Sequence, residues 1–509
     1  MIHEIPESID SLFRERSTGR VYLRAPLEGA HDFDRLHYDD FDTVSKSYAR
    51  EFAARGFLPG DRVGIVIGSP VHFLLAFFGG MRCGLWMAPL DPTLDYDALP
   101  QFSAQVQSLG LRAVIADRST PTTSPIPWFG GSPRPEFHFF EHSANSSYTP
   151  SSEGGILLAS SGTTGTPKVM LLSQRQFLTT ATNIANHHAL SSRDVGLNPL
   201  PLWHINAEVV AATASAVAGA ELVLQRRFKR TDFWQLVADH GVTWINAVPA
   251  IVSHLATLRE GETVSPRIRF IRSASAPLPA ELITHFESVI GIPVIESYGM
   301  TEAASQICAN PLDGVRKPGS VGQPVGVSLR IEPLSDDSIE TPSSGPEIGQ
   351  IALHGPSVIT SYASDDYSSR FTTDGWLLTG DLGYIDDDGY VFLVGRSDDV
   401  INRSGEKIYP RELEEIILQV PGVLAASVIG VPDLILGSVP LAYIEVGDDY
   451  DDSDVCQAVS GALESAIGRS KRPTAIRVVD ALPRHATGKI QKNPLRDGAI
   501  SFRYEALLS

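Results

Sequence analysis

The chain has 509 residues, of which 43% are hydrophobic and 20% are charged. This composition is ordinary for a globular protein, and the chain is too long for a single hydrophobic core. Its formal net charge is −19, because 60 Asp and Glu residues outnumber 41 Lys and Arg residues. This excess of negative charge argues against nucleic acid or an anionic membrane surface as a partner.

The cysteines and the N-terminal segment predict a cytoplasmic protein. Cys83, Cys308 and Cys456 lie far apart, so the sequence has no CxxC metal or redox pair. The first residues, MIHEIPESID, lack the apolar core of a signal peptide. The longest apolar stretch, residues 72–90, contains Arg82 and three glycines, so we expect a buried helix followed by a strand and no membrane insertion.

Strand-like and helical segments alternate through the first three-quarters of the chain. The first series has strands at 61–68, 85–91 and 112–117, with a helix signalled by Ser-Pro between the first two. The second series has strands at 221–226, 242–249 and 267–275, with helices at 231–241 and 250–260. This alternation predicts two doubly wound α/β lobes, and ligands bind such lobes near the carboxyl ends of the parallel strands.

The pattern changes after about residue 315. Short glycine-rich strands at 319–326, 347–355 and 380–395 predict a small antiparallel β-barrel. Beyond Arg396 a helical segment and two strand-like runs predict a separate α+β unit. We therefore expect a large N-terminal domain, residues 1–396, of two doubly wound αβ lobes plus a small β-barrel, and a smaller mobile α+β C-terminal domain, residues 397–509.

A glycine-rich loop, SSGTTGTPK, joins two strand-like runs. It does not fit the Walker P-loop, because only two residues separate Gly162 from Gly165 and Lys168 follows a proline. The chain continues into the strand-like VMLL, and Ser173 and Gln176 then predict a capping box that starts a helix. A polar hairpin tip is one interpretation. The other is a polyphosphate site, since small residues let backbone N–H groups and Lys168 approach an anion closely.

This loop and three further segments resemble the core motifs of the adenylate-forming enzymes, the ANL superfamily. The further segments are SYGMTE (297–302), GWLLTGDLGYIDDDGYVFLVGRSDDVI (375–401) and PRHATGK (483–489), in the family's order and at suitable distances. The resemblance covers essentially the whole chain. It implies a reaction in which a carboxylate and ATP give acyl-AMP and pyrophosphate, after which a nucleophile takes the acyl group.

The resemblance also implies the residues that bind ATP and Mg²⁺. Glu302 is the implied Mg²⁺ ligand, Thr301 the implied partner of the α-phosphate, and Tyr298 is implied to stack on adenine. Taken alone, YGMTE also fits a strand-to-helix turn and TGDLG also fits a turn around its aspartate. The full implied nucleotide set is Ser160, Ser161, Gly162, Thr163, Thr164, Gly165, Lys168, Ser275, Tyr298, Thr301, Asp381 and Arg396, the last two at the ribose.

Two residues of the last third are implied to act through domain movement. Lys489 lies in a glycine-containing loop, and the resemblance implies that it reaches the α-phosphate and the acid carboxylate during adenylation. Asp398 matches the family's hinge, about which the C-terminal domain rotates between an adenylating and a transferring arrangement. Together with His204, Thr301 and Glu302, Lys489 makes up the predicted catalytic set.

The acid substrate is expected to bind beside the segments PLPLWHINAE (199–208) and RSASAPL (272–278), next to Tyr298 of the SYGMTE motif. The implied pocket contains Trp203, His204, Asn206 and Gly299. For His204 we favour a hydrogen-bonded structural role over acid–base chemistry. Many relatives have a glycine shortly after the histidine, and this chain has Asn206-Ala-Glu instead, so a plain long-chain fatty acid is not expected.

The final acceptor is left open between CoA and an amine. CoA ligases of this family commonly carry GGE after the hinge, and here Ser404 replaces the first of these glycines. We favour CoA as the co-substrate, with a stand-alone amide synthetase as the alternative. A nucleotide sensor without turnover is disfavoured because Lys489, Glu302 and Asp381 are all present, and a luciferase-like oxidation is a remote option.

Overall fold

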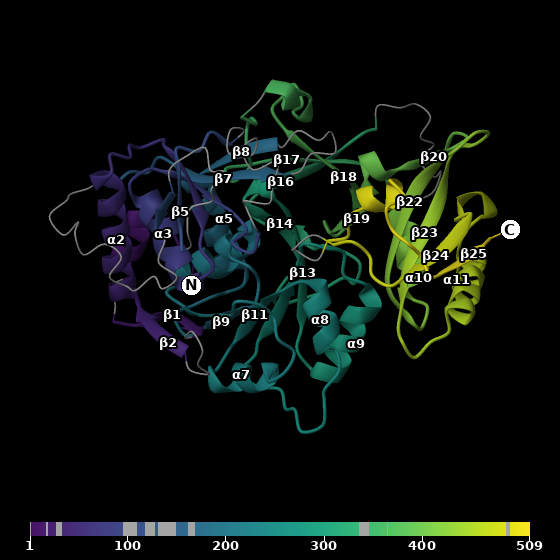
Figure 1. Ribbon diagram of the computed structural model, residues 1–509, viewed down its shortest axis with the longest axis horizontal. Helices are drawn as coiled ribbons and strands as arrows, with labels where there is room; N and C mark the ends of the chain where they lie inside the picture. Colours follow the sequence, from purple (N-terminus) through teal and green to yellow (C-terminus); the bar gives the residue numbers. More distant parts are fainter. Residues whose placement is uncertain are drawn as a thin grey trace.

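The computed structural model describes residues 2–16, 19–26, 33–94, 109–117, 128–130, 149–160, 168–334, 346–363, 365–484 and 489–508. Figure 1 shows a large body built from the purple-to-green part of the chain and a smaller unit built from the yellow-green C-terminal part. Two large, mainly parallel sheets make up most of the large body, as the two predicted lobes require.

The first lobe is a six-stranded sheet. Its order is β6 (Trp128–Gly130), β5 (Ala113–Ala116), β3 (Arg62–Val66), β4 (Trp86–Pro89), β7 (Gly155–Ser160) and β8 (Lys168–Ser173). Its strands run parallel except for β8, which pairs antiparallel with β7. Helix α3 (Pro70–Arg82) joins β3 to β4, and nearly all of its residues are buried. The apolar stretch at 72–90 is therefore a core helix and a strand, as predicted.

The second lobe is a nine-stranded sheet. Its order is β15 (Gln323–Pro324), β14 (Ser305–Ala309), β13 (Val294–Met300), β12 (Phe270–Ser273), β11 (Trp244–Ala247), β9 (Val195–Asn198), β10 (Glu221–Leu224), β1 (Val21–Pro26) and β2 (Phe33–His37). Within the run from β13 to β1, adjacent strands are parallel to each other. Strand β15 comes from the glycine-rich segment 319–326, which we expected in the barrel. It pairs with β14 in this sheet, while Val321 and Gly322 of the same segment make backbone hydrogen bonds with Val391 at the start of β19 (Val391–Arg396).

Helices cover both lobes. They are α1 (Ile9–Glu15), α2 (Tyr38–Ala54), α5 (Gln174–His187), α6 (Ala214–Ala218), α7 (Phe233–Asp239), α8 (Pro249–Leu255) and α9 (Ala280–Ile290), together with a π-helix, η2 (Asn206–Thr213). The capping box of α5 is confirmed, because the Ser173 hydroxyl accepts from the Gln176 N–H while Gln176 Oε1 accepts from the Ser173 N–H. Within the described residues no helix is both long and apolar enough to cross a membrane.

The predicted barrel segment contains a four-stranded antiparallel sheet of β16 (Ser328–Glu332), β17 (Gly349–His354), β18 (Leu377–Ile385) and β19 (Val391–Arg396). The C-terminal unit has its own sheet and core. Its elements are β20 (Ile401–Arg403), β21 (Glu406–Ile408), α10 (Pro410–Leu418), β22 (Val423–Asp433), β23 (Gly437–Val446), α11 (Asp452–Ala466), β24 (Ala475–Val479), α12 (Asn493–Arg496) and β25 (Tyr504–Leu507). The predicted α/β fold class, with a smaller α+β unit at the C-terminal end, is confirmed.

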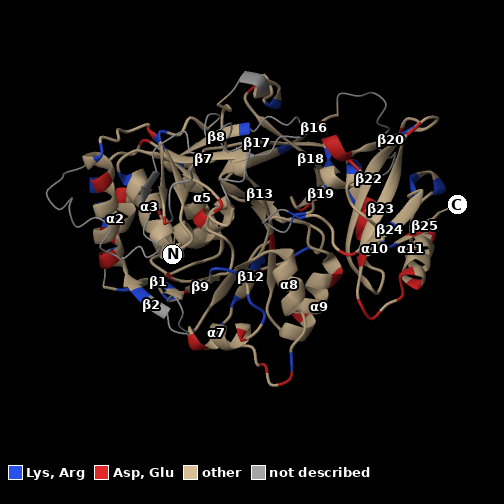
Figure 2. Cartoon of the chain, in the orientation of Figure 1, with Lys and Arg blue, Asp and Glu red and all other residues tan. Residues whose placement is uncertain are grey.

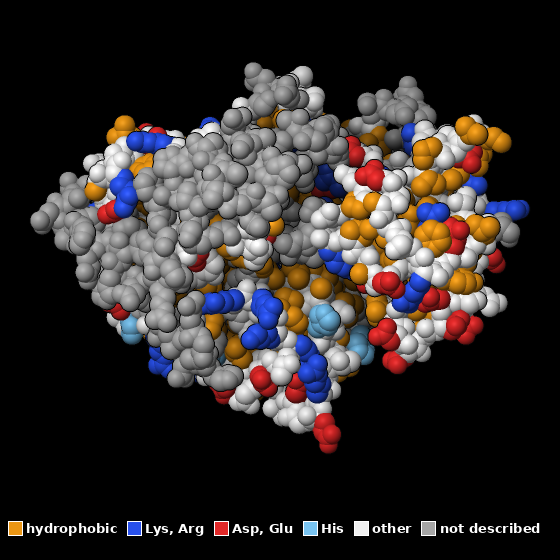
Figure 3. Space-filling model, in the orientation of Figure 1, with side chains coloured by type: hydrophobic (Ala, Val, Ile, Leu, Met, Phe, Trp, Pro, Cys, Tyr) orange, Lys and Arg blue, Asp and Glu red, His pale blue; other side chains and the backbone are white. Residues whose placement is uncertain are grey.

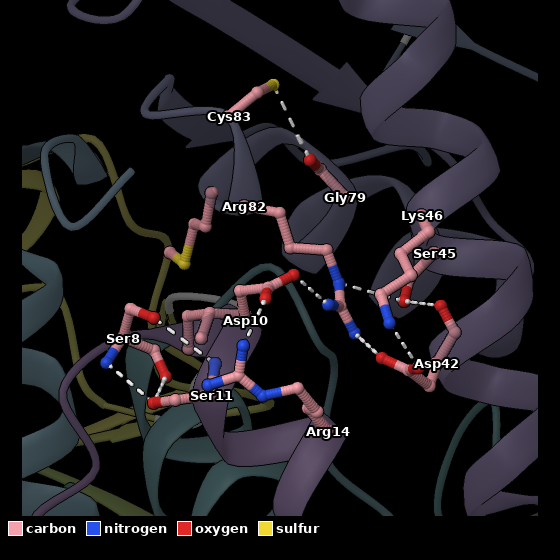
Figure 4. A network of polar contacts seen from close by, with 12 residues as sticks. Ser8, Asp10, Ser11, Arg14, Asp42, Ser45, Lys46, Gly79, Arg82 and Cys83 are labelled. Atoms are coloured by element: carbon pink, nitrogen blue, oxygen red, sulfur yellow. Dashed lines mark hydrogen bonds and ion pairs between the residues drawn. The ribbon is translucent and has the colours of Figure 1, made fainter. Parts of the chain in front are cut away.

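Asp and Glu residues occur in many parts of the chain, for example in α2 and in the C-terminal unit (Figure 2). The first lobe also buries a charged cluster where α1, α2 and α3 meet (Figure 4). Fully buried Arg82 donates from Nη1 to Asp10 and from Nη2 to Asp42, at 2.6 Å in both cases, and its Nε donates to the Ser45 hydroxyl at 3.2 Å. One guanidinium thus ties three helices together.

Loss of this guanidinium is expected to destabilise the first lobe. Arg82→Ala leaves two carboxylates without their shared cation, and breaking a buried ion pair costs about 3–5 kcal/mol of unfolding free energy. The control is Arg55→Ala directly after α2, whose pair with Glu51 is partly exposed, and there we expect a loss below about 1 kcal/mol. Urea unfolding of both variants measures the difference, and equal losses would contradict the role given to Arg82.

Candidate active site

Three sheets meet where β8, β13, β18 and β19 lie near the centre of Figure 1. Asp381 links two of these sheets from the middle of β18. Its Oδ2 accepts a hydrogen bond from the Tyr298 hydroxyl on β13, and its Oδ1 accepts from Arg396 Nη1 on β19 at 3.1 Å. Asp381 is therefore a strand residue and not the turn residue that TGDLG taken alone allowed.

The phenol of Tyr298 stays protonated in this arrangement. Burial raises the pKa of Tyr298 well above its usual range, and the neighbouring carboxylate of Asp381 raises it further. A protonated hydroxyl is a donor, so it fixes one oxygen of Asp381 while Arg396 fixes the other. Carboxylate oxygens accept more than one hydrogen bond, so Asp381 keeps acceptor capacity for two neighbouring hydroxyls.

Glu302 follows β13 in the short 3₁₀ helix η3 (Thr301–Ala303), and its side chain is buried. Its Oε1 accepts a hydrogen bond from the Tyr362 hydroxyl at 3.0 Å. Burial and the Glu302 carboxylate raise the pKa of Tyr362, so this hydroxyl remains a donor. Of the two carboxylate oxygens, only Oε1 makes a hydrogen bond within the described residues. A buried carboxylate with a free oxygen fits one ligand position of a hard cation such as Mg²⁺.

Positive charge gathers around these carboxylates. The ammonium of Lys168, at the start of β8, lies 5.1 Å from the centre of the Tyr367 ring. Its pKa is lowered, first by burial and then by the charge of Arg370. Gly380 has a φ of +81°, and a Cβ there would lie 2.8 Å from Arg370 Nη1 and 2.9 Å from Arg396 Nη2. Two guanidinium groups thus converge over this glycine, as an anion with several charges requires.

The predicted acid pocket is assembled in part. Asn206, the first residue of η2, donates from Nδ2 to the Ser275 hydroxyl at 3.2 Å and accepts from Arg272 Nη1 at 2.8 Å. The Trp203 and His204 rings lie just before η2, with their centres 6.1 Å apart. The turn after β12 therefore faces the segment after β9, as expected for carboxyl ends at one edge of a sheet.

Gly299 is fixed by packing between strands. A Cβ on this residue would lie 1.6 Å from the Ser305 carbonyl oxygen on β14, so no other residue fits without moving the backbone. Thr301 lies two residues further on, at the start of η3, and its carbonyl accepts from the Ala304 N–H at 3.0 Å. Ser275 has a φ of +77°, which is an uncommon conformation for a serine and marks a sharp turn beside Asn206.

Several predicted residues lie elsewhere or outside the described parts of the chain. Lys489 is exposed in the C-terminal unit, and it has no hydrogen bond or ion pair to any described site residue. The flanking chain extends from that unit toward the centre of Figure 1. Asp398 lies between β19 and β20, with its carboxylate 4.0 Å from Arg396 Nη2. The backbone of Ser160 ends β7, and outside the described residues lie Ser161, Gly162, Thr163, Thr164 and Gly165.

Two polar residues of this region, Tyr362 and Arg370, were not found from the sequence, because they precede the recognisable motif at 375–401. Arg272 begins the segment RSASAPL, which was expected beside the acid pocket, but the arginine itself was not singled out. No local signal distinguishes them, because their importance comes from the chain segments that fold against them. Figure 3 shows a hollow between the large body and the C-terminal unit, with hydrophobic side chains inside it and basic and histidine side chains at its rim.

A buried carboxyl group also lies where the C-terminal unit meets β13. Glu296 is on β13, two residues before Tyr298, and only 3% of it is exposed. Burial raises the pKa of Glu296 to about 7, although Arg411 on α10 acts in the opposite direction. Its Oε2 is buried without a hydrogen-bond partner among the described residues.

Comparison with known proteins gives matches over nearly the whole length. Residues 15–363 match the family described as AMP-binding enzyme, and residues 412–489 match the AMP-binding enzyme C-terminal domain. The chain is 36% identical to a sulfoacetate–CoA ligase of Cupriavidus necator, over 94% of this chain and 95% of that one. It is 30% identical to an oxalate–CoA ligase of Arabidopsis thaliana, over 92% and 94% respectively.

Solved structures also match this chain over nearly its whole length. ATP-bound MatB from Rhodopseudomonas palustris superposes with a TM-score of 0.83 at 27% identity, covering 96% of this chain and 99% of that one. The o-succinylbenzoate CoA synthetase MenE from Bacillus subtilis, in complex with its acyl-adenylate intermediate, gives a TM-score of 0.82 at 26% identity over 97% and 99%.

The pKa of Glu296 predicts a pH-dependent stability. The carboxyl ionises near its ordinary pKa of about 4.5 when unfolded and near 7 when folded, so its ionisation destabilises the folded chain progressively as pH rises from 4.5 to 7. Glu296→Gln cannot ionise, and at pH 8 we expect it to be more stable than the parent by on the order of 1–3 kcal/mol.

Thermal or urea unfolding at pH 5 and pH 8 measures this difference, which is expected to be smaller at pH 5. The control is Glu260→Gln at an exposed position, where the stability change is expected to be the same at both pH values. If Glu296→Gln changed stability equally at pH 5 and pH 8, its carboxyl would not carry the raised pKa.

Proposed function

The chain belongs to the AMP-binding enzyme family, and we propose that it is the CoA ligase of a small carboxylic acid with a second anionic group. It is an ATP-dependent, AMP-forming acid ligase, which adenylates a carboxylate with release of pyrophosphate and transfers the acyl group to CoA. The proposal concerns the acid, the residues that act on it and the place of the hinge.

The relatives support both the acceptor and the type of acid. Those named above are CoA ligases that match this chain over more than nine-tenths of its length, which favours CoA over the amine that an amide synthetase uses. Sulfoacetate carries a sulfonate beside its carboxylate, oxalate carries two carboxylates, and so does the 2-succinylbenzoate of a further relative from Enterococcus faecalis, which is 31% identical over 66% of this chain.

The observation that carries the proposal is the gathering of opposite charges at one point of the fold. Asp381 provides oxygens that suit neighbouring ribose hydroxyls, and Tyr298 and Arg396 hold those oxygens in place. Lys168 and Arg370 lie in the same region, with Arg370 close to Gly380, and they supply positive charge for the phosphates. Two anionic reactants repel each other, so positioning and charge neutralisation are what the reaction needs from the protein.

In the first half-reaction a carboxylate oxygen attacks the α-phosphorus, forming a C–O–P link as the bond from the α-phosphorus to the bridging oxygen breaks. In this proposal Lys168 and Arg370 neutralise charge on the departing pyrophosphate, and Thr301, which directly follows β13, hydrogen-bonds the α-phosphate. When bound through Glu302, Mg²⁺ supplies further charge neutralisation. In the second half-reaction the CoA thiol attacks the acyl carbonyl carbon and AMP leaves.

We place the domain boundary at residues 396 and 397, with Asp398 as the hinge. The short 3₁₀ helix η5 (Ser397–Asp399) joins the four-stranded sheet to the C-terminal sheet, and hinge residues need only absorb a change in backbone dihedral angles. Rotation about this point would bring Lys489 to the α-phosphate for adenylation and remove it for transfer. The three buried, unbridged cysteines are compatible with the expected cytoplasmic location.

The activity and acid class are tested in one set of reactions. The protein is incubated with Mg-ATP, CoA and one acid, namely sulfoacetate, oxalate, malonate, propionate or benzoate, and the products are identified by mass spectrometry. We expect AMP and an acyl-CoA with at least one of the acids that carry two anionic groups. An amide formed from added amines without CoA would support the amide synthetase instead, and turnover of propionate or benzoate alone would contradict the proposed acid class.

The role of Lys489 predicts a separation of the two half-reactions. Lys489→Ala is expected to lower acyl-AMP formation by at least about 100-fold, because one buried charge-assisted interaction at the transition state is worth roughly 3 kcal/mol. Transfer from supplied acyl-AMP to CoA is expected to remain. Pyrophosphate release and thioester formation are measured separately, with Lys229→Ala at an exposed position as the control. Equal loss of both half-reactions would contradict this role.

A further inference from the structure

A row of polar side chains crosses the nine-stranded sheet near the carboxyl ends of its central strands. The register of β11 with β12 sets Asn246 beside Arg272, and Asn246 Nδ2 donates to Asn198 Oδ1 on β9 at 3.0 Å. All three side chains are buried. The preceding residues of the three strands, Leu197, Ile245 and Ile271, are fully buried and apolar, so three adjacent polar side chains indicate that this part of the sheet does more than pack against the core.

Arg272 is the only charged member of this row. Only 1% of it is exposed, and both of its hydrogen bonds start at Nη1, to Asn206 Oδ1 at 2.8 Å and to Asn246 Oδ1 at 3.1 Å. Its Nε is buried with no hydrogen-bond partner among the described residues. The guanidinium is therefore oriented by two amides and keeps donors that the described chain does not use.

No described carboxylate neutralises this guanidinium. Burial lowers the pKa of Arg272 to about 9, with no carboxylate acting in the opposite direction. The titratable groups that interact with it are His187 and His188, and both would add positive charge if protonated. Arg82 in the first lobe shows the usual arrangement, with two carboxylates on one buried guanidinium. A buried cation without an anion is costly, so Arg272 is suited to an anion that arrives from outside the chain.

The hydrogen-bond chain leads from Arg272 into the predicted acid pocket. Asn206 is half-buried and links the guanidinium to Ser275, which is exposed at the sharp turn after β12. Trp203 and His204 precede Asn206 directly, and Tyr298 lies on the strand next to β12. An acid whose carboxylate reaches the nucleotide beside Tyr298 would direct its other end toward this network.

We propose that Arg272, oriented by Asn246 and Asn206, binds the second anionic group of the acid and makes the enzyme selective for small acids with a carboxylate or sulfonate at both ends. This inference rests on the proposed acyl-CoA ligase activity and assigns its selectivity to one residue. A guanidinium presents parallel donors that match a carboxylate or sulfonate. The two asparagines orient the guanidinium without neutralising it, so its charge remains available to the substrate.

The test measures selectivity, because a merely structural arginine would affect all acids alike. Pyrophosphate release is followed with malonate and with propionate, which have the same number of carbon atoms and differ in the second carboxylate, and also with sulfoacetate. For Arg272→Met we expect the ratio of kcat/KM for malonate to kcat/KM for propionate to fall about 10- to 100-fold, mainly through the KM for malonate, with the KM for ATP unchanged. Sulfoacetate is expected to behave like malonate.

Arg269→Gln is the matched control. Arg269 lies just before β12 and is paired with Asp194 at 2.6 Å, so its loss removes a nearby guanidinium without touching the network, and the selectivity ratio is expected to stay constant.

A second variant covers the case in which Arg272→Met fails to fold. Asn206→Asp places a carboxylate against Arg272 Nη1, where it neutralises the guanidinium from within the chain and repels a second anion. We expect the same fall in the selectivity ratio for this variant. Thermal unfolding shows for each variant whether it is folded.

Equal losses with malonate, sulfoacetate and propionate in a folded variant would overturn the assignment and leave the ligase activity standing. A parent enzyme that turns over propionate but neither dianionic acid would also overturn it. Absence of AMP formation by the parent with every acid tested would instead count against the proposed function itself, and the inference would fall with it.

Discussion

The site depends on the hydrogen bonds that Asp381 accepts from two different sheets. Tyr298 reaches it from the nine-stranded sheet and Arg396 from the four-stranded sheet, so one carboxylate fixes the relative position of β13 and β19. Glu302 is then placed by its position just after β13, and Tyr362 holds it from a segment beside the four-stranded sheet. Without this junction the predicted nucleotide residues would belong to separate lobes.

Charge is distributed unevenly in this protein. The chain as a whole has a net charge of −19, yet Lys168, Arg370 and Arg396 lie close together in the region that we propose binds the triphosphate. The excess of acidic residues disfavours polyanions such as nucleic acid, while a few local cations suffice for one small anionic ligand. Local positive charge matters more than net charge because interactions between exposed charges are screened within about 10 Å, and partly buried pairs are screened much less.

The two fully buried arginines of the core show two uses of the same side chain. Arg82 is neutralised by Asp10 and Asp42 and connects three helices, so its role is complete within the fold. Among the described residues Arg272 has two neutral amides as hydrogen-bond partners, and its network leads to the predicted acid pocket. The difference lies entirely in what surrounds each guanidinium. It separates a structural ion pair from a candidate recognition site.

The sequence by itself determined the α/β class, the capping box at Ser173, and the order of the motifs that contain Lys168, Tyr298, Glu302 and Asp381, because these depend on local patterns of a few residues. Only the tertiary structure decided that β15 joins the nine-stranded sheet, that Asp381 is a strand residue between two partners, and that Arg272 is buried without a carboxylate. Burial and pairing are set by residues far away in the chain, so no local pattern contains them.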